Sequence, residues 1–176
     1  MRITTNGRYG LRIMLDIALN SSSGPVSRED IARRQGITPN HIAQLFRSLT
    51  NASLAKSMMG PGGGYRLART AAQIRVGDII EAMEGPVTMV YCSSAEGGKP
   101  CSRMDRCAAH LLWLSLSRAI RKHLDKISLQ DMCEIARQLE EIEFPGDQEV
   151  LENILAMLDQ LPPNSPERHQ TSSAIV

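Results

Sequence analysis

The stretch SREDIARRQGITPNHIAQLFRSLTNASLAKSMMGPGGGYRL, residues 27–67, decides the fold. Ser27 is a typical N-cap for a short helix, and Gly36 suits the tight turn that follows this helix. Thr38 then caps a second helix, in which Pro39 takes the first position, where its missing N–H costs nothing. Two short helices joined by a glycine turn are typical of the helix-turn-helix motif.

The second helix, which we expect to run to about Asn51, has two chemically different faces. Apolar residues recur at the i, i+3, i+4, i+7 spacing and should face the core: Ile42, Leu45, Phe46 and Leu49. The opposite face carries small or polar residues that can reach base edges and phosphates: Asn40, Ala43, Gln44 and Arg47. His41 at the start of this helix is an equally good candidate for packing and for base recognition.

A β-hairpin should follow the second helix directly. Residues 54–58 and 65–67 are predicted strands, and the glycines of 60–64 tolerate the positive φ angles of a hairpin tip. A phosphate-binding loop would end in Gly-Lys-Ser/Thr, and Tyr65 stands there instead. A hairpin after a recognition helix is a wing, so we expect DNA contacts from Arg2, Ser27, Thr38, Asn40, His41, Gln44, Arg47, Gly60, Gly62, Gly63 and Tyr65.

Charge is divided unevenly along the 176 residues. Residues 1–75 hold eleven basic and three acidic side chains, and residues 76–176 hold nine and sixteen, which gives +8 and −7. The basic half indicates a polyanionic partner such as double-stranded DNA, with ordinary solvated charge as the alternative. No apolar run approaches the ~20 residues that span a bilayer, and no signal peptide is recognisable, so we expect a cytoplasmic protein without a membrane partner.

Composition and periodicity together predict a mostly α fold with a small β-hairpin. Aromatic residues make up only 3% of the chain, which favours helix packing by aliphatic residues. Apolar residues cover a wide arc of the helix predicted from Cys107 to about Lys126, as at a dimer interface. The expected organisation is a winged helix-turn-helix domain (1–85), a cysteine loop (86–107), dimerisation helices (108–144), and an extra helix with a disordered tail (145–176).

Three cysteines and a histidine follow the pattern Cys92-x8-Cys101-x5-Cys107-x2-His110. Thiolate ligands suit either zinc or an iron–sulfur cluster, and the spacing alone leaves these two equally favoured. Reactive thiols without a metal are a third interpretation. Cys133 lies in an apolar-periodic helix and is predicted to be a buried thiol.

The whole pattern resembles the IscR-like iron–sulfur regulators, a branch of the Rrf-type winged-helix transcription factors. The resemblance covers about residues 1–135 and is carried by MRIT (1–4), GRY (7–9), MLDIAL (14–19), GPV (24–26), IA (31–32), QGI (35–37), QLF (44–46), GPGGGY (60–65), VGDII (76–80), the cysteine loop and His110-x2-Trp113. It implies a homodimeric regulator, acting as a repressor, whose affinity for its DNA operator depends on a 2Fe-2S cluster. The implied ligands are Cys92, Cys101, Cys107 and His110.

Two departures from the family pattern stand out. Eight residues separate Cys92 from Cys101, where five would be expected. The family often has an arginine just before Gly60 that reaches the minor groove, and this chain has Met58 and Met59 instead.

Two rival functions follow from the same residues. A zinc-stabilised DNA-binding protein would use the same four ligands without sensing. A redox enzyme would need a substrate site, and the sequence offers no Ser-His-Asp set, no paired catalytic carboxylates and no nucleotide loop. We therefore expect neither enzymatic activity nor a small-molecule substrate.

Overall fold

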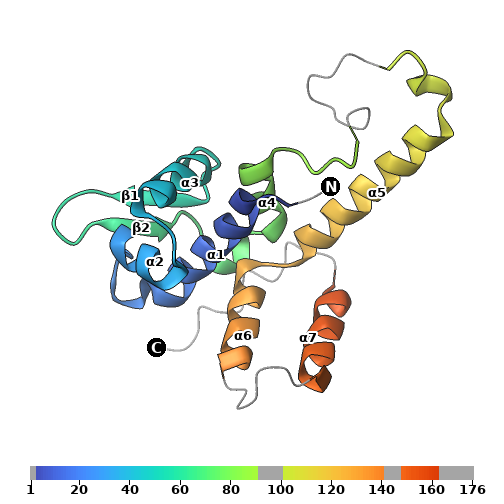
Figure 1. Cartoon of the computed structure of the whole chain (residues 1–176). Helices are drawn as coiled ribbons and strands as arrows, with labels where there is room; N and C mark the ends of the chain where they lie inside the picture. The colour runs from blue at the N-terminus through green and yellow to red at the C-terminus, as the bar shows by residue number, and fades with distance from the viewer. Residues whose placement is uncertain (1–2, 91–100, 141–147, 163–176) are drawn as a thin grey trace.

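The computed structural model describes residues 3–90, 101–140 and 148–162, and it confirms the mostly helical fold with one β-hairpin (Figure 1). The helices are α1 (Thr5–Asn20), α2 (Arg28–Gln35), α3 (Pro39–Asn51), α4 (Val76–Glu84), α5 (Ala108–Lys126), α6 (Leu129–Glu140) and α7 (Gln148–Gln160). The strands are β1 (Ala55–Met58) and β2 (Gly64–Leu67). Short 3-10 turns lie at η1 (Ser21–Ser23), η2 (Ala71–Gln73) and η4 (Met104–Arg106).

The caps predicted for the helix-turn-helix unit are present. The Ser27 hydroxyl accepts a hydrogen bond from the Asp30 backbone N–H at 3.0 Å and so starts α2. Gly36 ends α2 in the left-handed conformation, with a φ of 66°. Thr38 caps α3 through the His41 backbone N–H at 3.3 Å.

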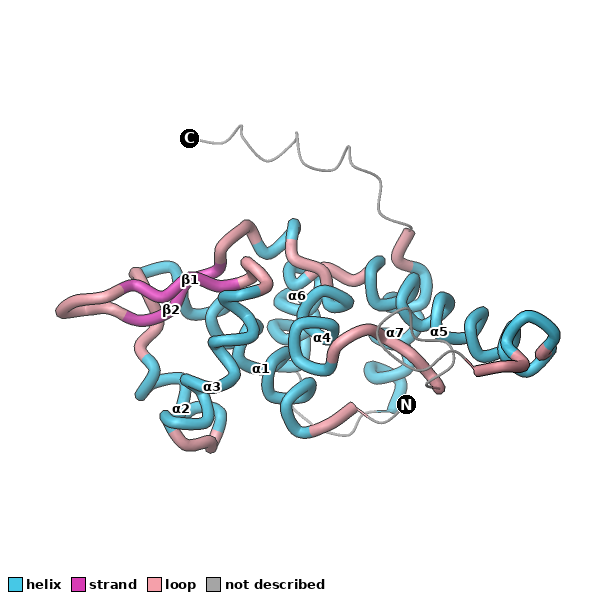
Figure 2. The backbone as a smooth tube through the Cα atoms, turned by 90° about the horizontal axis from the view of Figure 1, so that it is seen from above, coloured by secondary structure: helices cyan, strands magenta, loops and turns pink. Residues whose placement is uncertain are grey.

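α1 lies at the centre of the molecule, where it contacts α2, α3, α4 and α6 (Figure 2). Its buried residues join those of α2, α3 and α4 in the main core: Ile13, Met14, Ile17, Ile31, Ile42, Leu45, Phe46, Leu49 and Ile79. The four residues of α3 that were predicted to face the core are therefore all buried. This core fixes the orientation of α3 relative to the rest of the molecule.

α5 leaves this body as a projecting arm (Figure 1). Ser117 is its only buried residue, and three leucines are exposed by 65%, 59% and 38%: Leu111, Leu112 and Leu116. Near its C-terminal end α5 is joined to α4 by Arg121, which donates to Asp78 at 3.0 Å and pairs with Glu81. The C-terminal part of the arm is thus anchored to α4.

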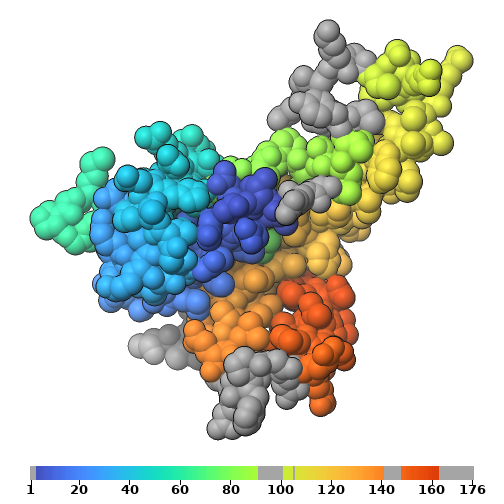
Figure 3. All heavy atoms as spheres, in the orientation of Figure 1, coloured from blue at the N-terminus to red at the C-terminus, as the bar shows by residue number. Residues whose placement is uncertain are grey.

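α7 packs beside α6 and the C-terminal half of α5 (Figure 3). Leu158 and Leu161 rest against a second buried cluster at the junction of α4 and α5, which consists of Val76, Ile80, Val87 and Ile127. Within the described residues, no helix combines the length and the apolar character needed to cross a membrane.

Candidate nucleic-acid interface and cysteine helix

α3 presents its polar residues to solvent. Asn40, Gln44 and Arg47 are exposed, while Ala43 is half-buried. No hydrogen bond or ion pair of the Asn40, Gln44 or Arg47 side chains occurs within residues 3–90, 101–140 and 148–162. An exposed helix face with free amide and guanidinium groups is the chemistry that reads base edges and contacts phosphates.

His41 is held by α1 rather than presented to solvent. Its Nε2 lies 3.4 Å from the Asn6 Oδ1, and its ring meets the Tyr9 ring edge-on with 5.7 Å between the ring centroids. These contacts favour the packing interpretation of His41 over base recognition.

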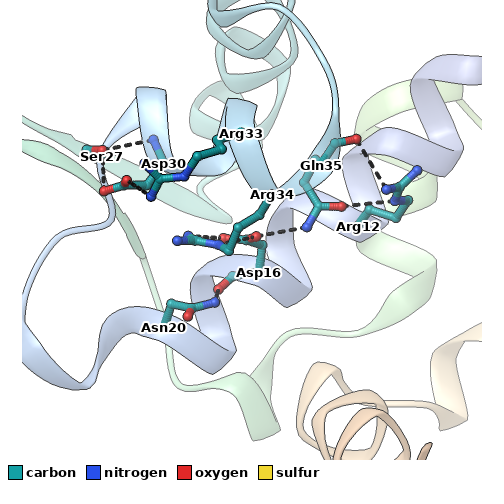
Figure 4. A network of polar contacts seen from close by, with 8 residues as sticks. All are labelled: Arg12, Asp16, Asn20, Ser27, Asp30, Arg33, Arg34 and Gln35. Carbon is teal, nitrogen blue, oxygen red and sulfur yellow. Dashed lines mark hydrogen bonds and ion pairs between the residues drawn. The ribbon is translucent and has the colours of Figure 1, made fainter. Parts of the chain in front are cut away.

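The orientation of α2 is fixed by a buried charge on α1 (Figure 4). Arg34 donates to both carboxylate oxygens of Asp16, at 2.5 and 2.9 Å, and Gln35 donates to the same carboxylate at 2.8 Å. Asp16 is only 2% exposed, and its hydrogen bond raises the pKa of Arg34. Arg12 donates in turn to the Gln35 side chain at 3.0 Å. α2 is therefore bound to α1 by a bidentate pair, which helps hold the adjoining α3 in place.

The hydroxyls of Ser27 and Thr38 are engaged in helix capping. Ser27 Oγ also donates to the Asp30 carboxylate at 2.7 Å, and this hydrogen bond lowers the pKa of Asp30. A hydroxyl that caps a helix positions the free backbone N–H groups of the first turn, which favour an anion. Any contact of these two residues with DNA is therefore expected through the helix N-terminus.

The base of the wing is clamped to the chain before α2. Tyr65 and Val26 exchange two backbone hydrogen bonds, at 2.8 and 2.9 Å. The Tyr65 ring stacks on the Phe46 ring with 3.4 Å between centroids and 2° between planes. Burial raises the pKa of Tyr65. A side chain on Gly64 would collide with the Val26 carbonyl, so glycine is required there. These contacts tie the wing to α3 and favour a packing role for the Tyr65 ring.

The tip of the wing has the expected glycine geometry. Gly60 and Gly62 adopt φ angles of 108° and 75°, and the Gly63 N–H donates to the Gly60 carbonyl at 2.9 Å. Met59 beside them is 97% exposed. Two further exposed cations, Lys56 and Arg66, face each other across the strands and were not among the residues predicted to contact DNA. The alternation of residues along the predicted strands could have revealed them.

The cysteine site is only partly described. Arg2 and Cys92 lie outside the described residues. Cys101 is exposed, Cys107 is half-buried at the N-cap of α5, and His110 lies in the first turn of that helix. The His110 Nδ1 is buried and has no hydrogen-bond partner in the described part of the chain. Within the same part, no three His, Cys, Asp or Glu side chains are grouped closely enough to hold a metal ion.

Cys133 stands apart from this set. It is 2% exposed in α6, and burial raises the pKa of its thiol, in agreement with the predicted structural role.

Comparison with known proteins shows what the chain is similar to. Residues 3–135 match the family model described as "Rrf2: Iron-dependent Transcriptional regulator". The chain is 44% identical to the HTH-type transcriptional regulator IscR of Xenorhabdus nematophila over 132 residues, 75% of this chain and 79% of that protein. It is 43% identical to IscR of Yersinia enterocolitica over 142 residues, 77% of this chain and 85% of that protein.

The chain is also similar to solved structures of transcriptional regulators. The structure of T. potens IscR matches with a TM-score of 0.65 and 32% identity, covering 82% of this chain and 94% of that chain. CymR, the global cysteine regulator of B. subtilis, matches with a TM-score of 0.61 and 34% identity, covering 77% and 98%.

Proposed function

Because this chain belongs to the Rrf2 family of transcriptional regulators, we propose that a 2Fe-2S cluster held by Cys92, Cys101, Cys107 and His110 controls its affinity for an operator. The chain is a DNA-binding transcriptional regulator and not an enzyme. We propose further that the protein acts as a homodimer and that it represses transcription.

The available donors suit such a cluster. Cys101 and Cys107 are free thiols, and a buried imidazole nitrogen without a partner is costly unless it meets a ligand. Cys107 and His110 also lie at the N-terminus of α5, where the helix dipole favours negative charge. When bound, a cluster with a histidine ligand would supply a one-electron redox centre.

One hydrogen bond carries the proposal for Cys92. The Met89 backbone N–H donates to the Ser117 Oγ at 3.0 Å, so the chain returns to α5 three residues before Cys92. Three extended residues span at most about 10–11 Å. Ser117 lies seven residues beyond His110, or about 10 Å along the helix axis. The chain between Met89 and Cys92 is therefore long enough to span the distance from Ser117 to His110, which supports Cys92 as a ligand beside His110.

Signal transmission would follow α5. Two of the candidate ligands, Cys107 and His110, lie at its N-terminal end, and Arg121 near its other end is bonded to Asp78 and Glu81 of α4. A change in how Cys107 and His110 are held would shift α5 against α4, and α4 packs on α3. Operator affinity would change because the orientation of α3 changes.

We propose that a second copy of the chain covers the exposed leucines of α5. Three large apolar side chains on one projecting helix are costly in water, and a symmetric helix pair would bury them. Such a dimer would read a near-palindromic operator with half-sites about 34 Å apart, or a multiple of that distance.

The test is anaerobic purification with absorbance spectra and with iron, sulfide and zinc analysis. We expect a coloured wild-type protein with iron and sulfide in equal amounts. Cys92→Ala, Cys107→Ala and His110→Ala should lose the colour, while Cys133→Ala should keep it because that thiol is buried in α6. The comparisons lend no support to the zinc alternative. A colourless wild-type protein that contains zinc would nevertheless favour the zinc alternative. A Cys107→Ala protein with the same iron content as the wild type would refute the ligand assignment.

A further inference from the structure

We infer that the wing makes a two-part contact with DNA: Lys56 and Arg66 bind backbone phosphates, and Met59, with Met58 beside it, enters the adjoining minor groove as an apolar wedge. The inference rests on the DNA-binding function proposed above. It adds a contact surface and a sequence preference to that function.

The register of the hairpin separates its two faces. Lys56 pairs with Arg66 and Met58 with Gly64, while Ser57 pairs with Tyr65 between them. Successive residues of a strand point to opposite faces. Because Tyr65 points inward onto Phe46, the two pairs next to it along the strands, Lys56–Arg66 and Met58–Gly64, point outward. Lys56, Arg66 and Met58 therefore share the outward face, and Gly64 leaves the Met58 side chain uncovered.

The two cations on this face lack compensation. Lys56 and Arg66 are exposed, and no carboxylate pairs with either of them in the described parts of the chain. Like charges directly opposite each other in an antiparallel pair destabilise the sheet. An anion on the outward face would remove this repulsion, and DNA phosphate is the anion that lies beside a recognition helix in the major groove.

The tip has a different chemistry. Met59 is 97% exposed and Met58 45% exposed, at the end of a hairpin that carries no charge between residues 57 and 65. A hairpin that follows a helix seated in the major groove crosses the backbone toward the neighbouring minor groove, which is only about 6 Å wide. One unbranched side chain fits such a groove. Apolar side chains inserted there contact sugars and base edges.

The clamp at the base of the wing lowers the entropic cost of this contact. The backbone bonds between Tyr65 and Val26 and the stack on Phe46 hold the hairpin against α3. Little conformational freedom is then lost when Met59 enters the groove.

An apolar wedge implies a sequence preference. Guanine places an N2 amino group in the minor groove, and A·T pairs do not. The methylene and thioether groups of Met59 offer this donor no strong acceptor. The wing should therefore prefer A·T pairs at its contact, and inosine–cytosine pairs should substitute for them, because inosine lacks only the N2 amino group.

The experiment uses the duplex that wild-type protein selects from a random pool of double-stranded DNA. Binding is measured by fluorescence anisotropy over a range of KCl concentrations. Met59→Ala should weaken binding about tenfold with an unchanged salt slope, because the lost contact is apolar. Because the proposed dimer carries two wings, Lys56→Ala/Arg66→Ala should lower the magnitude of the salt slope by about four, and Met59→Arg should raise it by about two. Lys122→Ala, an exposed cation on α5, is the matched control and should change neither quantity.

A second measurement uses the same duplex with its flanking A·T pairs replaced by G·C or I·C. Wild-type protein should bind the I·C duplex as it binds A·T and the G·C duplex more weakly, whereas Met59→Ala should bind the three alike. Wing variants that bind like the wild type would overturn the inference and leave the proposed function intact. Wild-type protein that selects no sequence at all would instead refute the proposed function. A change in oligomeric state of Met59→Ala, with unchanged DNA affinity, would also overturn the inference in favour of a protein partner.

Discussion

The carboxylate of Glu84 caps a helix that begins almost eighty residues earlier: it accepts a hydrogen bond from the Gly7 backbone N–H at 2.8 Å. It also accepts from the Thr4 hydroxyl at 2.6 Å. A negative charge at the N-terminus of α1 satisfies free N–H groups and complements the helix dipole. The C-terminal end of α4 is thereby fixed to the first turn of α1.

Gly7→Ala should destabilise the protein by about 1–3 kcal/mol, although alanine is the better helix former. A β-carbon on Gly7 would lie 2.5 Å from the Glu84 Oε1 and 2.8 Å from the Ile3 side chain. Urea denaturation measures the effect, with Thr5→Ala as control. The stability lost through Gly7→Ala should be smaller when Glu84 is already replaced by alanine. If the effects of Gly7→Ala and Glu84→Ala on the free energy of unfolding simply add, this explanation is wrong.

Ser27→Ala should cost about 1 kcal/mol, because it removes the cap of α2. The Ser27 hydrogen bond also holds the pKa of Asp30 below its usual range. The stabilisation that comes from ionised Asp30 is therefore complete above the ordinary aspartate pKa and is lost as the pH falls through the lowered pKa of Asp30. The difference between wild type and Ser27→Ala, from thermal melts, should therefore be full at pH 7 and shrink below about pH 4. Ser27→Thr keeps a hydroxyl and should behave like the wild type; a difference that grew in acid would contradict the role of Asp30.

Tyr65→Phe and Tyr65→Ala distinguish packing from a direct DNA contact. The phenylalanine variant keeps the stack on Phe46, so stability and DNA affinity should stay near the wild-type values. The alanine variant should lose about 3–5 kcal/mol and bind DNA more weakly, because the wing loses its support. Denaturation and anisotropy measure both quantities. If Tyr65→Phe binds DNA as weakly as Tyr65→Ala, the hydroxyl contacts DNA and the packing interpretation is wrong.

Arg121→Met should uncouple α5 from the DNA-binding domain. The substitution removes the bonds to Asp78 and Glu81 and leaves Asp125 without its cation. We expect the ratio of DNA dissociation constants, with and without the cluster, to fall toward one, while the iron content stays unchanged. Lys122→Met, its exposed neighbour, serves as control. An unchanged ratio would exclude this route of transmission.

Local signals in the sequence predicted the helix-turn-helix unit well. Ser27, Gly36 and Thr38 act on residues within four positions of themselves, so their roles can be read from the chain alone. The buried face of α3 followed from periodicity in the same way.

Contacts between distant segments could not be read from the sequence. The stack of Tyr65 on Phe46 and the contact of His41 with Asn6 and Tyr9 depend on tertiary packing, so the sequence could not reveal these contacts of two residues that we predict to meet DNA. The hydrogen bond from the Met89 N–H to Ser117, which brings the chain before Cys92 to α5, is another such contact. The spacing of the cysteines in the sequence does not predict it.

The placement of α7 has a practical consequence for anyone who shortens this protein to the length of its family. The family match ends at residue 135, yet Leu158 and Leu161 pack against the buried cluster of Val76, Ile80, Val87 and Ile127. A truncated version would therefore expose apolar surface where α5 meets α4. Aggregation of such a fragment would result from that exposed apolar surface and would give no information about metal loading.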